Sequence, residues 1–319
     1  MVEKSGVSVV IPTYNEEKSI EKLIELLSKQ TYSIDEIIIS DANSKDKTLE
    51  ILKKYVELGH NIKFAKRNGF CRGSGRNAGI NTAKNDLIAL IDAGSYPEKD
   101  WIENLLNQYN SKDDIVFGCV KPIHNNLIQF SLSVLIVGKS SQEITISPTV
   151  SSMLINKKTW LKVGKFKESK NGDYIVEDLM FINEIKKSNK QIHYAKRAIV
   201  NWILPSNISK IFLRFLEYSS GGIKSGFYEI WHHGIIRNIL ILLILLILSY
   251  FNVFLILILP FLLLIRSYLY LKEKIIYKKM NLLDKVKSLL TLSFILTLVD
   301  LASIFGVFKW LFDYKKASE

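Results

Sequence analysis

The sequence predicts an α/β domain with a parallel, doubly wound sheet, followed by a helical membrane part. Two observations carry this prediction. Over about the first 90 residues, short apolar runs alternate with amphipathic helical patterns, which is typical of parallel strands joined by helices. The segment 239–265 has no charged residue, and an uncharged apolar stretch of this length is typical of membrane helices.

The predicted strands of the first domain are short apolar runs that end in polar or turn residues. They cover 6–11, 35–40, 62–65, 87–91, 113–121, 147–155, 191–194 and 198–202. The helix after the first strand carries Ile20, Leu23, Ile24 and Leu27 on one face. Later helices are predicted from Thr48, from Arg76 after a glycine-rich loop at 69–75, at 157–163, and within 172–187.

Polar residues follow the ends of three predicted strands. They are Thr13, Tyr14, Asn15, Asp41 and Asp92. Ligands of doubly wound sheets bind outside the carboxyl ends of the strands. We therefore expect these side chains to converge on one crevice, and this convergence is the strongest physical indication of a ligand site in the sequence.

The charge of the chain narrows the class of partner. Its formal net charge of +12 fits nucleic acid, an anionic membrane surface or phosphorylated substrates. The basic residues do not interleave with aromatic residues in a nucleic-acid pattern, so we expect no nucleic acid polymer as partner.

Cys71 and Cys119 give neither a disulfide framework nor a metal-ligand spacing. The N-terminal apolar run is too short for a secretory signal, which predicts a cytoplasmic catalytic domain.

The apolar C-terminal part allows two topologies. Either a single tilted or kinked span breaks near Asn252 or Pro260, or a hairpin joins spans at about 235–250 and 253–271. The lysine-rich segment that follows favours the hairpin, because positive loops stay in the cytoplasm. A third apolar segment, at about 288–311, contains Asp300, which is costly in lipid unless it is paired or hydrated. It is either a third span or an interfacial helix. The expected location is the cell membrane, with more than one crossing.

Four ordered motifs carry a family resemblance: VSVVIPTYNEEKSI, SDANSKDKT, GSGRNAGINTAKNDLIALIDAG and GDYIVEDLMFINEIKKSNKQIHY. They resemble the motifs of glycosyltransferase family 2, whose catalytic domain has the Rossmann-like GT-A fold that binds nucleotide-diphospho-sugars. The resemblance covers about residues 5–225. It implies a catalytic domain at 1–228, including an amphipathic interfacial helix at 205–228, and a membrane domain at 229–319.

The resemblance implies a nucleotide-sugar donor site at Thr13, Tyr14, Glu16, Asp41 and Arg76. Tyr14 can stack on the base or pack on its own strand. Asp41 can accept hydrogen bonds from base or ribose, or close a turn. Glu16 can do similar work or lie in a first helical turn.

Arg76 can neutralise the diphosphate or form a structural ion pair. Arg72 is a weaker candidate in the same loop.

The metal site departs from the family pattern. The family has Asp-x-Asp after the fourth strand, whereas this chain reads Asp92-Ala93-Gly94. The resemblance implies that Asp92 binds Mg²⁺ or Mn²⁺ together with the diphosphate. One protein carboxylate with phosphates and water can hold such an ion, although the missing second carboxylate weakens the expectation.

The acidic pair Glu177-Asp178 matches the catalytic segment of the family. Asp178 is the expected general base and Glu177 its positioning neighbour. The alternative is that both are ordinary acids at a helix N-terminus. A helix at Lys210–Lys224 is expected to lie on the membrane, or to be a core helix. The Gln-x-x-Arg-Trp motif of processive synthases is absent there, which favours transfer of a single sugar.

The predicted function is transfer of one sugar, with inversion, from a UDP- or GDP-sugar to a lipid-linked, polyprenyl-phosphate-borne or membrane-proximal glycan acceptor. Two alternatives stay open. A polyprenyl-phosphate sugar synthase would use the phosphate itself as acceptor. A non-catalytic member would act as a membrane scaffold or glycan-binding protein.

Overall fold

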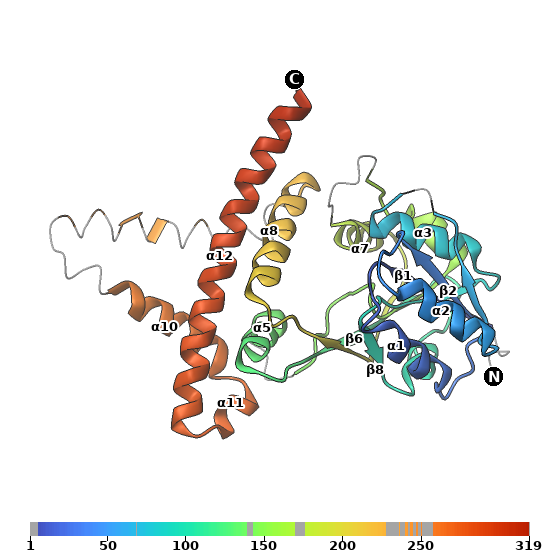
Figure 1. Cartoon of the computed structure of the whole chain (residues 1–319), viewed down its shortest axis with the longest axis horizontal. Coiled ribbons are helices and arrows are strands. Elements are labelled where there is room, and N and C mark those ends of the chain that lie inside the picture. Colours follow the sequence, from blue (N-terminus) through green and yellow to red (C-terminus); the bar gives the residue numbers. More distant parts are fainter. Residues whose placement is uncertain are drawn as a thin grey trace. The chain divides into compact units, whose positions relative to one another are not determined.

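The computed structural model describes residues 6–67, 69–138, 143–169, 176–227 and 258–318, with a few single positions between 236 and 250. The chain forms two compact units. The first comprises Met1–Lys121, Ile144–Asp173 and Glu177–Ile203, and the second comprises Pro122–Glu143, Tyr174–Val176 and Leu204–Glu319. Figure 1 shows the elements of both units along the chain.

The first unit is built on an eight-stranded mixed sheet in the order β3-β2-β1-β4-β7-β6-β8-β5. Four strands are parallel, namely β1 (Val7–Thr13), β2 (Glu36–Asp41), β3 (Ile62–Phe64) and β4 (Leu87–Leu90). β7 (Met153–Asn156) runs antiparallel to β4 and to β6 (Ile115–Ile123), and β5 (Ser95–Pro97) runs antiparallel to β8 (Ile192–Ile203). The predicted parallel arrangement of the first four strands is confirmed.

Helices cover both faces of this sheet. Successive side chains of a strand point to opposite faces, so alternate residues of β1 pack against different sets of helices. Val7, Val9 and Ile11 of β1 join a cluster with α1 (Ile20–Ser28), α2 (Thr48–Glu57) and α4 (Trp101–Leu106). Val10 joins a second cluster with α3 (Arg72–Thr82), α6 (Lys157–Val163) and α7 (Glu177–Lys187). The fully buried apolar run of β1 is what a strand covered on both faces requires.

α3 begins earlier than the sequence indicates. The predicted glycine-rich loop at 69–75 is wrong in its second half, because Gly73 and Gly75 lie in the first turns of α3. A Cβ atom on Gly73 would lie 2.1 Å from the carbonyl oxygen of Lys167. These glycines therefore permit a close approach of other segments to the start of the helix.

Two predicted boundaries of the sheet are also corrected. The strands predicted at 191–194 and 198–202 form one strand, β8, in which the charged Lys196 and Arg197 are exposed while the ladder continues. The strand predicted at 147–155 is shorter, because only β7 pairs with its neighbours. The short β5 and α4 have too few residues for a periodic pattern.

The second unit is helical. Its described helices are α5 (Leu127–Val137), α8 (Ile208–Lys224), α10 (Ile258–Leu271), α11 (Ile275–Lys279) and α12 (Leu282–Ser318). Within the described part of the chain, α12 is the one helix long and apolar enough to cross a membrane, over Leu282–Asp313. It contains the predicted segment 288–311. The predicted span 235–250 and the turn after it lie largely outside the described residues, and α10 is the described part of the span predicted at 253–271.

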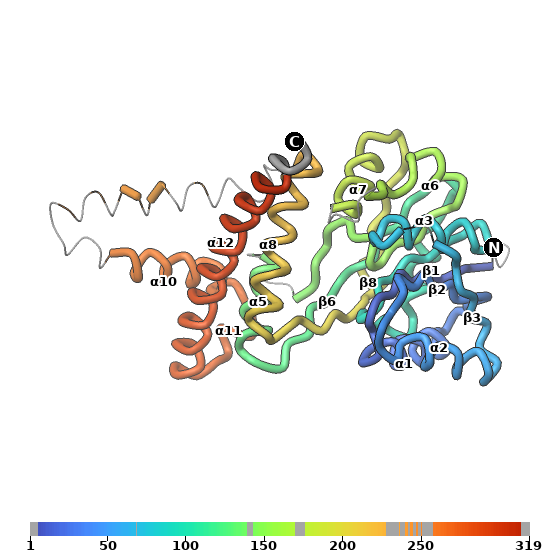
Figure 2. Tube along the Cα trace, turned by 45° about the horizontal axis from the view of Figure 1, so that its top comes forward, coloured from blue at the N-terminus to red at the C-terminus, as the bar shows by residue number. Residues whose placement is uncertain are grey.

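Small residues let α8 pack closely along α12, and Figures 1 and 2 show the two helices side by side. The hydroxyl of Ser219 donates to the carbonyl oxygen of Ser303 over 2.8 Å. A Cβ atom on Gly306 would lie 2.6 Å from the carbonyl oxygen of Leu216. One face of the amphipathic α8 is thus buried in the helical unit, and its predicted place at a membrane surface stays a prediction.

Asp300, the acid within the apolar part of α12, has a cationic partner. Its carboxylate accepts hydrogen bonds from both terminal nitrogens of Arg266 in α10. Pairing of this kind reduces the free-energy cost of a charge among apolar residues.

Candidate active site

Arg76 is the centre of a buried charge cluster in the first unit. It lies in α3 with only 2% of its side chain exposed. Its Nη2 is 2.7 Å from Oδ1 of Asp92, which follows β4, and its Nη1 is 2.7 Å from Oε1 of Glu177, the first residue of α7. One guanidinium therefore joins three segments that are far apart in the sequence, and it does so with both of its terminal nitrogens.

Asp92 is held as a charged carboxylate. Its second oxygen, Oδ2, accepts a hydrogen bond of 2.6 Å from the hydroxyl of Ser151. Burial acts to raise the pKa of Asp92, but the charges of Arg76 and Arg72 and the Ser151 hydrogen bond outweigh it and lower the pKa. Ser151 was missed from the sequence, because a serine just before a strand carries no signal of its own.

Glu177 and Asp178 are neighbours with different surroundings. Glu177 is buried, and burial raises its pKa despite the opposing charge of Arg76, with the charge of Asp178 adding to the rise. Asp178 is only half-buried, and its Oδ1 accepts a hydrogen bond of 2.9 Å from the backbone N–H of Leu179. Among the described residues no cation lies within 4.0 Å of Asp178. Of the two acids, Asp178 is therefore the more exposed and Glu177 the one that Arg76 engages.

The strand ends of β1 and β2 lie together, as the sequence predicts. Thr13 and Asp41 are register partners in the parallel ladder. Tyr14 follows directly and is 56% exposed, so its side chain is accessible to a ligand. Asp41 accepts from both the backbone N–H and the hydroxyl of Ser44, at 2.8 and 2.5 Å. The carboxylate of Asp41 therefore closes a turn.

Glu16 is held by hydrogen bonds to the start of α2 and to its own loop. Its backbone N–H donates to the hydroxyl of Thr48 over 2.7 Å, and its carboxylate accepts from the hydroxyl of Ser19. Burial raises the pKa of Glu16; Ser19 and the charge of Arg72 oppose the rise, while the charges of Asp46 and Asp92 add to it. Glu16 and Asp92 thus lie in each other's electrostatic field, with Arg72 acting on both.

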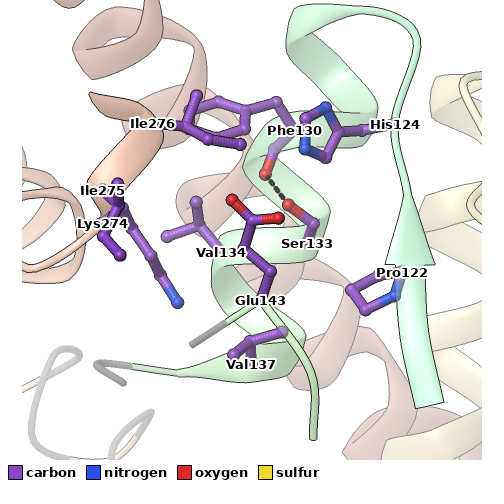
Figure 3. A pocket seen from close by; sticks show the side chains of 10 residues that line it. All are labelled: Pro122, His124, Phe130, Ser133, Val134, Val137, Glu143, Lys274, Ile275 and Ile276. Atoms are coloured by element: carbon purple, nitrogen blue, oxygen red, sulfur yellow. Dashed lines mark hydrogen bonds between the residues drawn. The ribbon is translucent and has the colours of Figure 1, made fainter. Parts of the chain in front are cut away.

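A separate pocket lies in the second unit, and none of the predicted site residues lines it. It is formed by α5 and the start of α11, with Phe130, Val134 and Ile276 as apolar walls (Figure 3). His124, Glu143 and Lys274 are its ionisable residues. The pocket and the charge cluster around Arg76 are different sites.

The comparison with protein families is decisive for the first unit. Residues 8–172, more than half of the chain, match the family described as "Glycosyl transferase family 2". The chain belongs to glycosyltransferase family 2. The predicted enzyme class, a glycosyltransferase, is thereby confirmed.

Curated relatives of this family member match over limited lengths. A dolichyl N-acetyl-α-D-glucosaminyl phosphate 3-β-D-2,3-diacetamido-2,3-dideoxy-β-D-glucuronosyltransferase of Methanococcus voltae is 36% identical over 107 residues, which are 32% of this chain and 33% of the relative. The poly(ribitol-phosphate) β-N-acetylglucosaminyltransferase TarS of Staphylococcus aureus is 24% identical over 200 residues, or 61% of this chain and 32% of the relative. For the first curated relatives, the chain spans between 12% and 33% of their length.

One solved structure resembles nearly the whole of this chain. It is the mannosyltransferase PcManGT of Pyrobaculum calidifontis, in complex with GDP-Man and Mn²⁺, with a TM-score of 0.57 at 15% identity over 98% of this chain and 88% of that one. This likeness shows the fold, and with the family match it confirms the predicted GT-A-like α/β architecture.

Proposed function

We propose that the chain is an inverting glycosyltransferase that moves a single sugar from a UDP- or GDP-sugar to a lipid-linked or membrane-proximal glycan acceptor. The observation that carries the proposal is the double ion pair of Arg76. It ties Asp92, the expected donor-site acid, to Glu177, the neighbour of the expected base Asp178. The acceptor class is supported by the Methanococcus voltae relative, whose name describes a dolichyl-phosphate-linked sugar as acceptor, and by the apolar helix α12.

The donor would bind at the ends of β1, β2 and β4. Tyr14 offers an exposed ring on which a base can stack, and Asp41 and Thr13 stand beside it. Both terminal nitrogens of Arg76 are engaged by carboxylates. We therefore assign Arg76 to positioning Asp92 and Glu177, rather than to contact with the diphosphate. Arg72, whose charge acts on both Asp92 and Glu16, is the better candidate for that contact.

Asp178 would activate the acceptor. As general base, its carboxylate takes the proton of the acceptor hydroxyl while the hydroxyl oxygen forms the new bond to the anomeric carbon. The bond from that carbon to the diphosphate oxygen breaks on the opposite face, and its electron pair leaves with the nucleoside diphosphate. Glu177, fixed by Arg76, holds the start of α7 and so the neighbouring Asp178 in place.

The residues after β4 fit a divalent cation, Mg²⁺ or Mn²⁺. Asp92 is charged and partly exposed, and the atoms nearest to the missing side chain of Gly94 are those of the Glu16 carboxylate. Such an ion, when bound, would neutralise the charge of the departing diphosphate.

The membrane arrangement we propose is multi-pass, with the catalytic domain in the cytoplasm. α12 would anchor the chain. The region from α10 to the start of α12 carries an excess of positive charge, which favours the cytoplasmic side; its cations are Arg266 in α10, Lys272, Lys274, Lys278 and Lys279 between the two helices, and Lys285 and Lys287 in the first turns of α12.

The test is nucleotide release from a panel of UDP- and GDP-sugars. It uses the full chain in detergent with Mg²⁺ or Mn²⁺, with and without a lipid extract from the source cells. Release from one donor that depends on the lipid supports the proposal and names the sugar. If nucleotide release is the same with and without the lipid extract, the proposal of a lipid-linked acceptor is wrong. Nucleotide binding without release from any donor would instead support the non-catalytic scaffold.

A further inference from the structure

Position 94 has no side chain, yet a carboxylate lies beside it. Gly94 has φ +80°, the left-handed region that glycine adopts freely. A Cβ atom built there would lie 3.4 Å from Oε2 and 3.8 Å from Oε1 of Glu16. The carboxylate of Glu16 therefore occupies the neighbourhood in which the second acid of an Asp-x-Asp pair would begin.

Glu16 is held in this position by its loop. Asn15, with φ 54°, turns the chain after β1. The backbone oxygen of Glu16 then accepts from the N–H groups of Ser19 and Ile20 at 3.0 and 2.9 Å, and its N–H donates to Thr48. The Ser19 hydroxyl donates to Oε2, so hydrogen bonds hold Glu16 at both its backbone and its side chain. Oε1 has no hydrogen bond among the described residues.

Glu16 and Asp92 bring two negative charges into the same neighbourhood. Asp92 and Glu16 repel each other, and Arg72 acts favourably on both. Both oxygens of Asp92 already accept hydrogen bonds, from Arg76 and Ser151. A divalent cation bound to a diphosphate commonly takes one or two protein carboxylates, with water and phosphate oxygens completing its octahedron. A second fixed acid beside Asp92 meets that requirement.

We propose that Glu16 supplies the second carboxylate of the divalent-cation site, in place of the side chain that residue 94 lacks. The inference rests on the proposed function, because a nucleoside diphosphate provides the remaining ligands. It assigns Glu16 to the metal and the diphosphate end of the donor, rather than to the base or ribose. It also accounts for the glycine, since an aspartate at position 94 would bring a further negative charge against Glu16.

The direct experiment measures Mn²⁺ affinity and nucleotide affinity separately in the full-length protein. Bound Mn²⁺ is followed by the loss of the electron paramagnetic resonance signal of the aqueous ion, with saturating UDP and, in parallel, GDP. Nucleotide affinity is measured calorimetrically in EDTA. The variant is Glu16→Gln, which keeps the size of the side chain and a partner for the Ser19 hydroxyl. The matched control is Glu17→Gln, the adjacent acid, whose Oε2 accepts from the backbone N–H of Lys47 over 3.1 Å.

We expect Glu16→Gln to weaken Mn²⁺ binding by about tenfold or more, with nucleotide affinity in EDTA changed by less than about twofold. Glu17→Gln should bind Mn²⁺ like the wild type. Adding Gly94→Asp to Glu16→Gln should restore Mn²⁺ binding, because aspartate tolerates the left-handed region better than most residues. In the otherwise wild-type chain, Gly94→Asp should not improve it.

Three results would overturn the inference. Wild-type Mn²⁺ affinity in Glu16→Gln would do so, as would equal losses in Glu16→Gln and Glu17→Gln. A fall of nucleotide affinity in EDTA, with Mn²⁺ affinity intact, would place Glu16 on the nucleotide instead. Failure of the proposed function has a different signature, because the wild-type protein itself would then bind neither UDP nor GDP.

Discussion

Replacement of Arg76 by methionine tests the charge cluster that organises the candidate site. The substitution keeps an unbranched side chain in α3 but removes the partner of two carboxylates. Only 6% of the Glu177 side chain and 29% of the Asp92 side chain are exposed, so water cannot replace the guanidinium at Glu177. Removing one partner of a buried ion pair costs about 3–5 kcal/mol. We expect a loss of this size in the free energy of unfolding near neutral pH.

The pH dependence of this loss has a definite sign. Without Arg76, the pKa of Glu177, already raised by burial, rises further, and Asp92 loses its largest opposing charge. A carboxyl group whose pKa is raised in the folded state stabilises the fold below its unfolded pKa, and loses that contribution as pH rises through the folded pKa. The deficit of Arg76→Met should therefore be largest near about pH 8 and should shrink toward about pH 5. In the wild type, the lowered pKa of Asp92 delays its protonation to a more acidic pH.

The assay is thermal unfolding of the detergent-solubilised full chain, followed by tryptophan fluorescence at several pH values. The expected deficit corresponds to a decrease in Tm on the order of 10 °C. Lys187→Met, which breaks an exposed pair with Glu184, is the control and should change stability by less than about 0.5 kcal/mol. A decrease in Tm that is the same at every pH would refute the electrostatic reasoning, and would indicate lost packing instead.

Three further predictions follow from other parts of the molecule. Gly79→Ala should destabilise the first unit by about 1–3 kcal/mol, because its Cβ would lie 2.4 Å from Cγ1 of Val10; an unchanged denaturation midpoint would contradict this close contact of α3 and β1. Arg266→Leu and Asp300→Leu should each lower Tm more than the double replacement does, because each single change leaves one charge unpaired among apolar residues; additive losses would argue against the pair. Tyr14→Ala should weaken nucleotide binding by about 1–3 kcal/mol through lost stacking, measured by calorimetry, and unaltered binding would place the base elsewhere.

The sequence predicted the parallel core of the fold because the relevant signals are local. The apolar runs of β1, β2 and β4 and the polar residues after them need no distant partner to be recognised. The same holds for the segment that forms α12, which is recognised by its long run of apolar residues. The antiparallel half of the sheet was less accessible: β8 contains two charged residues that interrupt its apolar pattern, and β5 has only three residues.

The sequence supplied the candidate site residues, but it did not show which of them contact one another. Asp92, Glu177 and Arg76 were each proposed for separate reasons. That Arg76 binds both acids depends on the packing of α3 against α7, which no local pattern encodes. The same limit applies to Ser151 on Asp92, and to Glu16 beside Gly94. In each case the partners are distant in sequence, and the sequence identified an unusual residue without showing what compensates for it.

The most direct test of the central claim is the effect of Asp178→Asn on turnover with the donor that the panel identifies. If Asp178 is the base for transfer to a hydroxyl, kcat should fall by about 10²–10⁴-fold, with KM for the donor nearly unchanged and with Glu184→Gln, on the same helix, as active as the wild type. Retention of most of the activity in Asp178→Asn would contradict the account. It would favour an acceptor phosphate, which needs no strong base.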